Sequence, residues 1–464
     1  MDETAHRGGI RRTPGARGRG REPRGIPEAP GAWPLIGHLV PLARDPLALL
    51  RSLPAHGPLV RVRMGPVPLV VICDPELTRQ ALLDDRLFDK GGPVFERFRD
   101  VLGDGLAGCP HQAHRRLRRL AQPAFHPDRL PGYARTMTAC FQEATGSWKP
   151  GQTLAVPTEM MAITSRVTAA ALFSGSLPAA GLGQVVDDVR TIAGGLFRRM
   201  LLLPPLDRLP TPGNRAYARA HARLRRTCDR IIAERRSDGT DHGDLLSALV
   251  AARDPEDGGR GMTDEEVSDT ILTVFLAGTE TTAATLAWAL DLLARHPEVE
   301  RRLHGEVDTV LRARPATHAD LPRLELAGLV IVETLRLHPA AWFLTRAVTR
   351  DTSLGGYSLP VGSGLVYSPY LLHHRPDLHA DPETFDPDRW TPDRPQPPRD
   401  AFIPFATGAR KCIGDTFATV EATLALATIA ARWRLEHLPG RQRPRPALGA
   451  SYGPGDLRMR AVPR

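Results

Sequence analysis

The feature that most constrains this fold is a long apolar helix in the second half of the chain. The stretch TDEEVSDTILTVFLAGTETTAATLAWALDLLARHP begins with a capping box, Thr263 with Glu266, which predicts a clean helix start. About 32 residues at 1.5 Å each give a helix of roughly 48 Å, enough to cross the molecule. Because its middle is apolar on nearly every side, we expect this helix to run through the core.

The middle of this helix carries residues that packing alone would not select. A glycine in a helix interior costs on the order of 1 kcal/mol relative to alanine, and a buried carboxylate without a partner costs several kcal/mol more. A small residue, a glycine, an acid and a hydroxyl stand together at Ala277, Gly278, Glu280 and Thr281. This cluster favours a functional site over simple helix packing. Gly278 would let a plate-shaped group lie against the helix, and Glu280 and Thr281 would supply a proton path beside it.

The rest of the chain is predicted to be mostly helical. Residues 58–83 read as a β-hairpin followed by a helix, and short strands are expected among the prolines of 345–400. Further helices are predicted over roughly 112–122, 133–148, 183–203, 213–236, 297–312, 324–338 and 414–432. We therefore expect a mainly α fold with small β-sheets, built as a single domain over 27–464 after an Arg/Gly/Pro-rich disordered tail at 1–26.

Charge and cysteine content narrow the function classes. The net charge is +9, of which residues 1–25 supply +4, with seven arginines against three acids. This favours a solvated tail over a nucleic-acid arm. Five cysteines, an odd and sparse set, argue against a disulfide framework. No apolar run reaches the roughly 18–20 residues of a membrane span and no signal peptide opens the chain, so we expect a cytoplasmic protein.

One cysteine has unusual neighbours. In FATGARKCIG (405–414), Cys412 follows Arg410 and Lys411, with glycines at 408 and 414. A cysteine kept for packing prefers apolar neighbours, because a thiol behaves as a small hydrophobe. Cys412 is instead predicted to function as a thiolate.

Two sets of charged residues are ambiguous by themselves. Glu333 and Arg336 are spaced i, i+3 on a predicted helix, which by itself indicates a surface pair, and Arg389 in FDPDRW is a candidate third member. His114 and Arg118 share one face of a basic helix, which is usually a solvated face. A cofactor with carboxylates would change that interpretation, because arginine binds such groups bidentately.

Two apparent motifs are rejected. GDGLAG (103–108) matches a dinucleotide-binding pattern, but no apolar strand precedes it and Pro110 follows. Asp84 and Asp85 in DDRLFD resemble the aspartate-rich magnesium site of terpene cyclases, yet such pairs are usually solvated turns. A cyclase side activity would rest on these two aspartates alone.

Taken together, the motifs resemble those of the cytochrome P-450 superfamily, from about residue 27 onward. The cysteine loop F-x-x-G-x-R-x-C-x-G is matched by Phe405, Gly408, Arg410, Cys412 and Gly414. The oxygen-activation motif is matched by the cluster from Ala277 to Thr282, and the E-x-x-R pair with its later arginine by the set Glu333, Arg336 and Arg389. Ala406 stands where the family commonly has glycine, which reads as a mild change, and His114 stands where many relatives have tryptophan.

The resemblance implies a haem b cofactor with Cys412 as the thiolate ligand of its iron. It assigns His114, Arg118, Arg346 and Arg410 to the haem propionates, Phe405 to shielding of the sulfur, and Ala277, Gly278 and Gly414 to close approach of the macrocycle. Thr281 and Glu280 would deliver protons while one oxygen atom of O2 enters a C–H bond. Electrons would come from a separate ferredoxin and ferredoxin reductase, because no flavin or iron–sulfur domain fits in this length.

Stretches such as DRLFDKGGP and SPYLLHHRPDL are most similar to bacterial sesquiterpene oxidases, which suggests an apolar terpenoid substrate such as pentalenene, oxidised to an alcohol and further to an aldehyde. The alternative is another hydrophobic substrate, namely another terpene, a polyketide or a fatty acid. Candidates for the apolar pocket are Phe95, Phe98, Phe197, Phe275, Trp342 and Phe343, each of which is otherwise a core residue. A peroxide-using haem-thiolate enzyme or a haem sensor would not need the Glu280–Thr281 pair, and a nucleic-acid binder would rest on charge alone.

Overall fold

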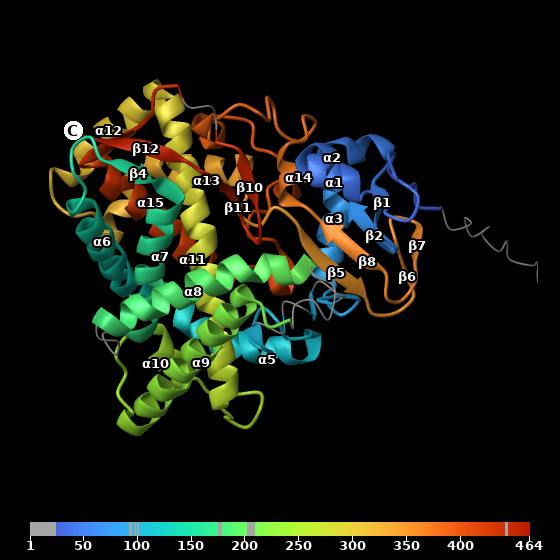
Figure 1. The fold of residues 1–464 in the computed structure, drawn as a ribbon, viewed down its shortest axis with the longest axis horizontal. Coiled ribbons are helices and arrows are strands. Elements are labelled where there is room, and N and C mark those ends of the chain that lie inside the picture. The colour runs from blue at the N-terminus through green and yellow to red at the C-terminus, as the bar shows by residue number, and fades with distance from the viewer. Residues whose placement is uncertain are drawn as a thin grey trace, which may run out of the picture.

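The computed structural model describes residues 25–91, 95–96, 99, 102–174, 179–201, 209–440 and 444–464. Figure 1 shows long helices on one side of the molecule and a strand-rich region on the other. The predicted tail at 1–26 lies almost wholly outside the described residues. The expectation of a mainly α fold with small sheets is confirmed.

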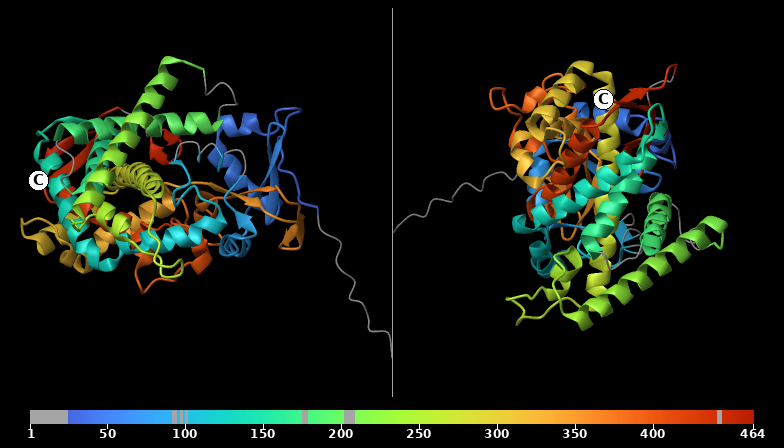
Figure 2. Two further views of the ribbon diagram at one scale, coloured as in Figure 1. Left: turned by 90° about the horizontal axis from the view of Figure 1, so that it is seen from below. Right: turned by 90° about the vertical axis from the view of Figure 1, so that its left-hand side faces the viewer.

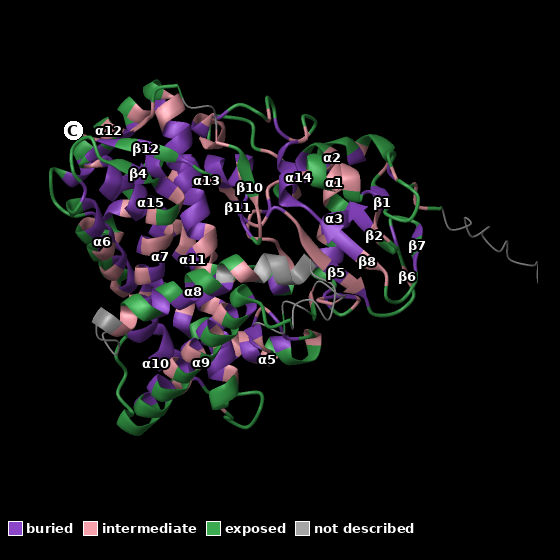
Figure 3. Cartoon of the chain, in the orientation of Figure 1, coloured by how far each residue is buried: buried purple, intermediate pink, exposed green. Residues whose placement is uncertain are grey.

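The predicted central helix is α11 (Asp264–Arg295), and its N-terminus carries the predicted capping box. Figure 3 shows it passing through the buried interior. By length and composition α11 passes for a membrane span, but 72% of its apolar window is buried inside the protein, as expected of a core helix. It packs most extensively on α7 (Val156–Phe173).

The other predicted helices are present within a few residues of their predicted bounds. They are α5 (His111–Ala121), α6 (Leu130–Gly146), α8 (Ala179–Leu201), α9 (Pro212–Asp238), α12 (Pro297–Leu311), α13 (Glu325–Leu337) and α15 (Asp415–Ala430). Figure 2 shows α9 extending along the outside of the molecule. The prediction missed α7, α10 (Leu245–Ala251) and the short α1 (Leu39–Arg44), α2 (Pro46–Ser52) and α14 (Pro369–His373). Much of α7 is buried, so its sequence lacks the polar stripe by which an amphipathic helix is recognised.

The largest sheet has the order β1-β2-β8-β5-β3. Its strands are β1 (Leu59–Met64), β2 (Val67–Ile72), β8 (Gly364–Tyr367), β5 (Leu344–Val348) and β3 (Phe88–Asp89), and α3 (Pro75–Leu83) follows the β1–β2 hairpin as predicted. Pairing of β3 with β5 sets Asp89 opposite Ala347. The sheet thereby brings residue 90 close to residue 346, although they are far apart in the chain.

The C-terminal segment forms short strands that pack against the helical part of the molecule. A three-stranded sheet has the order β4-β12-β9, from β4 (Thr153–Ala155), β12 (Arg458–Pro463) and β9 (Trp433–His437). A hairpin of β10 (Pro446–Leu448) and β11 (Tyr452–Pro454) packs against α11. A second hairpin joins β6 (Thr352–Leu354) and β7 (Tyr357–Leu359) at the edge of the strand-rich region.

Candidate active site

A cavity of about 330 Å³ lies between α11, the large sheet and the cysteine loop. Its wall is mostly apolar. Seven of the predicted cofactor residues line it, namely Ala277, Gly278, Arg346, Phe405, Arg410, Cys412 and Gly414, together with the predicted catalytic Thr281. All five cysteines are among the described residues, and Cys412 is the only one that lines this cavity.

The cysteine loop is a tight turn held by its own backbone. The Cys412 N–H donates to the Phe405 carbonyl at 3.0 Å, and the Lys411 N–H to that of Gly408 at 3.1 Å. Gly408 has φ +75°, and a Cβ there would lie 2.3 Å from the Leu82 carbonyl oxygen, so only glycine fits. Ala406 also has a positive φ, +57°, so its substitution for glycine is a strained one and not the mild change that the sequence suggested.

The Cys412 thiol is accessible from the cavity and otherwise enclosed by protein. Burial raises its pKa, while the Gly414 N–H, Arg118 and Lys411 act in the opposite direction. Without a metal the thiol is therefore not activated by its surroundings, so the thiolate expected from the sequence depends on metal coordination. A coordinating metal removes such a proton outright, so the loop is suited to a ligand cysteine.

The α11 wall of the cavity contains the predicted glycine. A Cβ at Gly278 would make only an ordinary contact, 3.6 Å from Thr168 Oγ1, so neighbouring helices do not demand glycine here. The open space beside it is the cavity. Thr281 Oγ1 donates to the Ala277 carbonyl at 2.6 Å, as in many buried helices. Glu280 does not line the cavity among the described residues, and its Oε1 accepts a 2.6 Å hydrogen bond from Ser451 Oγ.

Three cations line one end of the cavity. Arg410 is paired with Asp85 and Asp89, whereas Arg346 and Lys90 have no carboxylate partner among the described residues. Arg346 lies over the Tyr367 ring at 5.2 Å, and the Lys90 ammonium donates to the Ala107 carbonyl at 2.6 Å. Burial, with Arg346 and Arg410 nearby, lowers the pKa of Lys90 to about 7. The sequence analysis did not predict Lys90 as a site residue. The one feature that could have indicated it is its position directly after the buried strand β3.

The remaining predicted propionate partners, His114 and Arg118, lie behind the residues that line the cavity. His114 is buried on α5 and does not line the cavity among the described residues, and burial, with Arg410 and Lys90, lowers its pKa to about 3. Arg118 donates to the Lys411 carbonyl beside Cys412. Arg118 thereby supports the loop, and the contact of either residue with a propionate stays a prediction.

The acid–arginine set is a buried network and not a surface pair. Glu333 and Arg336 are both fully buried on α13 and form a bidentate pair at 2.8 and 2.9 Å. Arg389 Nε lies 3.0 Å from Glu333 Oε1, and Trp390 Nε1 donates to Oε2 at 2.8 Å. Removing one partner of such a pair costs on the order of 3–5 kcal/mol, because the other charge is left buried.

A histidine connects this network to the cysteine loop. His373 Nδ1 lies 3.2 Å from the Arg336 carbonyl, and the Ile403 N–H donates to its Nε2 at 3.0 Å. Burial lowers the pKa of His373 well below its usual range, so the ring is neutral and has one donor and one acceptor nitrogen. Ile403 in turn accepts from the Ala406 N–H. No local pattern in the sequence indicates this connection.

The aromatic pocket candidates mostly lie elsewhere. Phe275 is fully buried and packs on Phe173, with ring centroids 6.5 Å apart. Trp342 and Phe343 contact each other at 4.5 Å, and neither they nor Phe275 line the described cavity. Phe95 lies 5.4 Å from the Lys90 ammonium. Phe98 and the side chain of Phe197 lie outside the described residues.

The rejected motifs do not form sites of their own. Gly103 of the glycine run has φ +67° and lies in a turn, and no described residue between 90 and 103 is in a strand. Asp85 is not a solvated turn residue but is buried beside Arg410 and His111. The described residues contain no group of three or more His, Cys, Asp or Glu side chains placed for a metal ion.

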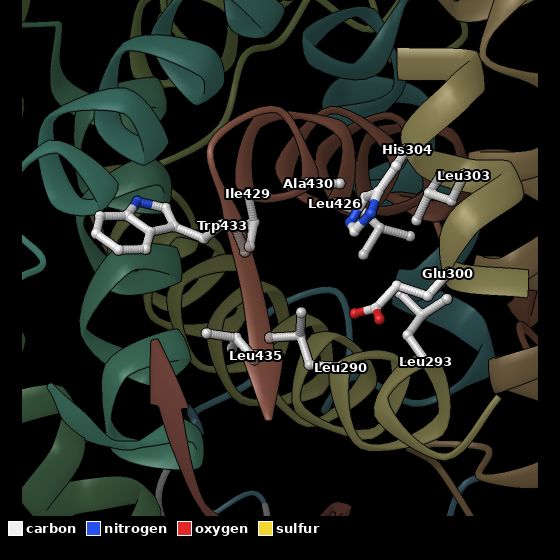
Figure 4. Close-up of a pocket in the computed structure, with 10 residues that line it drawn as sticks. All are labelled: Leu290, Leu293, Glu300, Leu303, His304, Leu426, Ile429, Ala430, Trp433 and Leu435. Carbon is white, nitrogen blue, oxygen red and sulfur yellow. The ribbon is translucent and has the colours of Figure 1, made fainter. Parts of the chain in front are cut away.

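A second cavity is structural. Figure 4 shows Glu300 and His304 of α12 facing leucines of α11 and α15 and the strand β9. Its volume of about 10 Å³ is about that of one water molecule, which excludes a substrate. Burial raises the pKa of Glu300 and lowers that of His304 to about 4.

The main cavity fits a flat apolar group with carboxylates at one end and a metal at its centre. Cys412 supplies a sulfur ligand at one wall, Gly278 leaves the opposite wall bare, and Lys90 and Arg346 offer unneutralised charge for carboxylates. Residues 27–452 match the cytochrome P-450 family. The chain belongs to this family. Its cofactor is haem, with the iron ligated by a cysteine thiolate, and the resemblance seen in the motifs is confirmed.

Several relatives of this cytochrome P-450 match nearly its whole length. It is 47% identical to a cyclooctat-9-en-7-ol 5-monooxygenase of Streptomyces melanosporofaciens, over 89% of this chain and 90% of the relative. It is 45% identical to a pentalenene oxygenase of Streptomyces avermitilis, over 94% and 97%. The haem domain of cytochrome P450DA superposes with a TM-score of 0.86 at 28% identity, covering 96% of this chain and 99% of that one.

Proposed function

We propose that this cytochrome P-450 monooxygenase oxidises an apolar terpenoid, a sesquiterpene such as pentalenene, at a C–H bond, first to an alcohol and then to an aldehyde. The observation that carries the proposal is the mostly apolar cavity into which Cys412 opens. The terpene-oxidising relatives support the substrate class.

Bound haem supplies dioxygen activation, and this chain's residues hold and protect it. Cys412 would hold the iron, and Phe405 would shield its sulfur. Arg346, Arg410 and Lys90 would hold the carboxylates, with His114 and Arg118 behind them. Gly278 and Gly414 leave room for the macrocycle. Thr281 lines the cavity, and its hydroxyl oxygen lies beside the Ala277 carbonyl. There the hydroxyl group orients a proton donor, and Glu280, the preceding residue, is the source of the proton.

The electron donor in this proposal is a ferredoxin that docks near Cys412 in the cytoplasm. Two arginines of α5, the helix beside the cysteine loop, are already paired with carboxylates of this chain and are not free to bind such a partner. Arg116 is paired with Asp257 and Glu266, and Arg119 with Asp254. Arg115 is exposed on the same helix with no ion pair among the described residues, and it is a candidate contact for an acidic partner.

The test begins with the carbon monoxide difference spectrum of the reduced protein. The wild type is expected to show the red-shifted band of a haem thiolate, Cys412→Ser to lose it, and Cys140→Ser, a cysteine of α6 outside the cavity, to keep it. Pentalenene and a fatty acid of equal carbon number are then titrated for the spin-state shift of a substrate that displaces water. A shift with the fatty acid alone would overturn the terpenoid assignment and favour the alternative hydrophobic substrate.

A further inference from the structure

The acid of the oxygen-activation motif is bound to the β10–β11 hairpin and does not line the cavity among the described residues. Glu280 Oε1 accepts from Ser451 Oγ at 2.6 Å and from the Ser451 N–H at 3.3 Å. At 3.6 residues per turn Glu280 lies about 100° round the helix from Thr281. The carboxyl group therefore sits beside the proton path that it is expected to serve, but outside it.

Ser451 is well placed to hold a side chain, because the hairpin around it is fixed from several directions. Trp288 Nε1 donates to the Tyr452 carbonyl at 3.1 Å, and the Tyr452 N–H to that of Ala340 at 2.9 Å. Trp342 Nε1 donates to the Gly449 carbonyl at 3.2 Å. Ser451 itself is buried. Glu280 thus has a rigid donor pair on one side and the cavity on the other.

We propose that Ser451 is a positioning residue that retains Glu280 in a stand-by conformation and so limits proton delivery to Thr281. Rotation about the Glu280 side-chain torsions moves the carboxyl group from the hairpin to the edge of the cavity. In each cycle it passes on one proton and takes one up from water, and no electron moves. The proposal rests on the haem-thiolate chemistry above but not on the identity of the substrate.

The test compares Ser451→Ala with Ser451→Thr, which keeps a hydroxyl, each with and without Glu280→Gln. Dithionite-reduced, haem-loaded protein is mixed with air-saturated buffer, without substrate, in H2O and D2O. Ser451→Ala is expected to reoxidise several-fold faster than the wild type with a smaller solvent isotope effect, and Ser451→Thr to resemble the wild type. With Glu280→Gln present, Ser451→Ala should add nothing.

A second readout is independent of turnover. The infrared stretch of carbon monoxide bound to the reduced protein responds to charge near the ligand. Ser451→Ala should add a shifted band as the carboxyl group approaches, and this band should vanish in the double variant with Glu280→Gln. An unchanged or slower reoxidation, or a band shift that persists without Glu280, would overturn the proposal and assign Ser451 a structural role in the hairpin. Failure of pentalenene to bind would leave both measurements unaffected.

Discussion

Arg410 Nη2 lies 2.7 Å from Asp89 Oδ1, which ties the residue two before the haem-ligand cysteine to the end of strand β3. Asp85 lies on the same guanidinium, 3.3 Å from Nε, and the Cys109 carbonyl accepts from Nη1 at 2.8 Å. The guanidinium is nearly inaccessible to solvent, so these partners compensate the cost of burying its charge. Two aspartates of a motif that resembles a magnesium site thus serve to orient an arginine.

The first prediction concerns this pair. Asp89→Asn should lower the haem-to-protein ratio and the Tm, because a buried charge loses its partner at a cost of up to about 3–5 kcal/mol. Absorbance of the purified protein and thermal unfolding measure both. Asp84→Asn, an exposed neighbour, is the matched control and should change neither. Equal haem content in the two variants would contradict a role for Asp89 in holding Arg410.

The second prediction follows from Lys90. In the haem-free protein its pKa is lowered to about 7, whereas a neighbouring carboxylate would restore the charge. Haem binding above pH 7 should therefore take up a proton, so affinity should fall as pH rises above about 7. Lys90→Met should bind haem more weakly at pH 6 and show a flatter pH profile. Haem titration of the apoprotein from pH 6 to 9 measures this. A slope unchanged in Lys90→Met would assign the proton to another group.

The sequence predicts the site correctly where its residues belong to one short motif. The cysteine loop spans ten residues, the acid and threonine of α11 are adjacent, and the capping box of that helix spans four, so the spacing within each is interpretable. Lys90 was missed because its role depends on the pairing of β3 with β5, which sets it beside Arg346. The burial of Glu333 and Arg336 was missed for the same reason, because the spacing of two residues indicates that they are close but not that they are buried.

The aromatic residues illustrate the opposite error, in which the sequence predicts site residues that the structure places elsewhere. The sequence predicts large side chains near the motifs as pocket residues. In the structure Phe275 is buried in the core, and Trp342 anchors the β10–β11 hairpin. The aromatic residues that do line the described cavity are Phe125, Tyr367, Phe405 and Phe417, beside smaller residues such as Ala340 and Leu344. The face of a helix that lines a cavity is set by packing over the whole chain. A local sequence pattern therefore does not predict that face.

The third prediction addresses the electron donor. Arg115→Glu should raise the KM for reduced ferredoxin roughly three- to tenfold, with a weaker dependence on salt, because one attractive charge becomes repulsive. Steady-state reduction at several ionic strengths measures this. Arg301→Glu, an exposed arginine on α12, carries the same change of charge away from α5. An equal effect of both variants would indicate a response to net charge and not a docking site.

The fourth prediction concerns Glu421, a fully buried acid on α15 whose two carboxyl oxygens have no hydrogen-bond partner among the described residues. Burial raises its pKa well above the usual range. The folded state keeps this proton after the unfolded chain has released it, so this contribution to stability is present at low pH and is lost as pH rises from about 4.5. The slope is at most about 1.4 kcal/mol per pH unit.

Glu421→Gln keeps the shape of the side chain and has no proton to lose. The variant should be more stable than the wild type at pH 8 and gain less at pH 5, as measured by denaturant unfolding of the haem-loaded protein. A difference between variant and wild type that is constant across pH would mean that Glu421 is not protonated in the folded state.

The position of Ser451 near the end of the chain also affects the order in which the site is assembled during synthesis. Glu280 is translated 171 residues before the serine that binds it. At roughly 5–20 residues per second, that interval is on the order of ten seconds to half a minute. Throughout it α11 lacks the hairpin that covers it, and β4 lacks its neighbour β12 in the C-terminal sheet. The nascent chain therefore carries α11, its longest described helix, incompletely covered until nearly the last residue has been added, and this is the period in which a chaperone would contribute most to its yield.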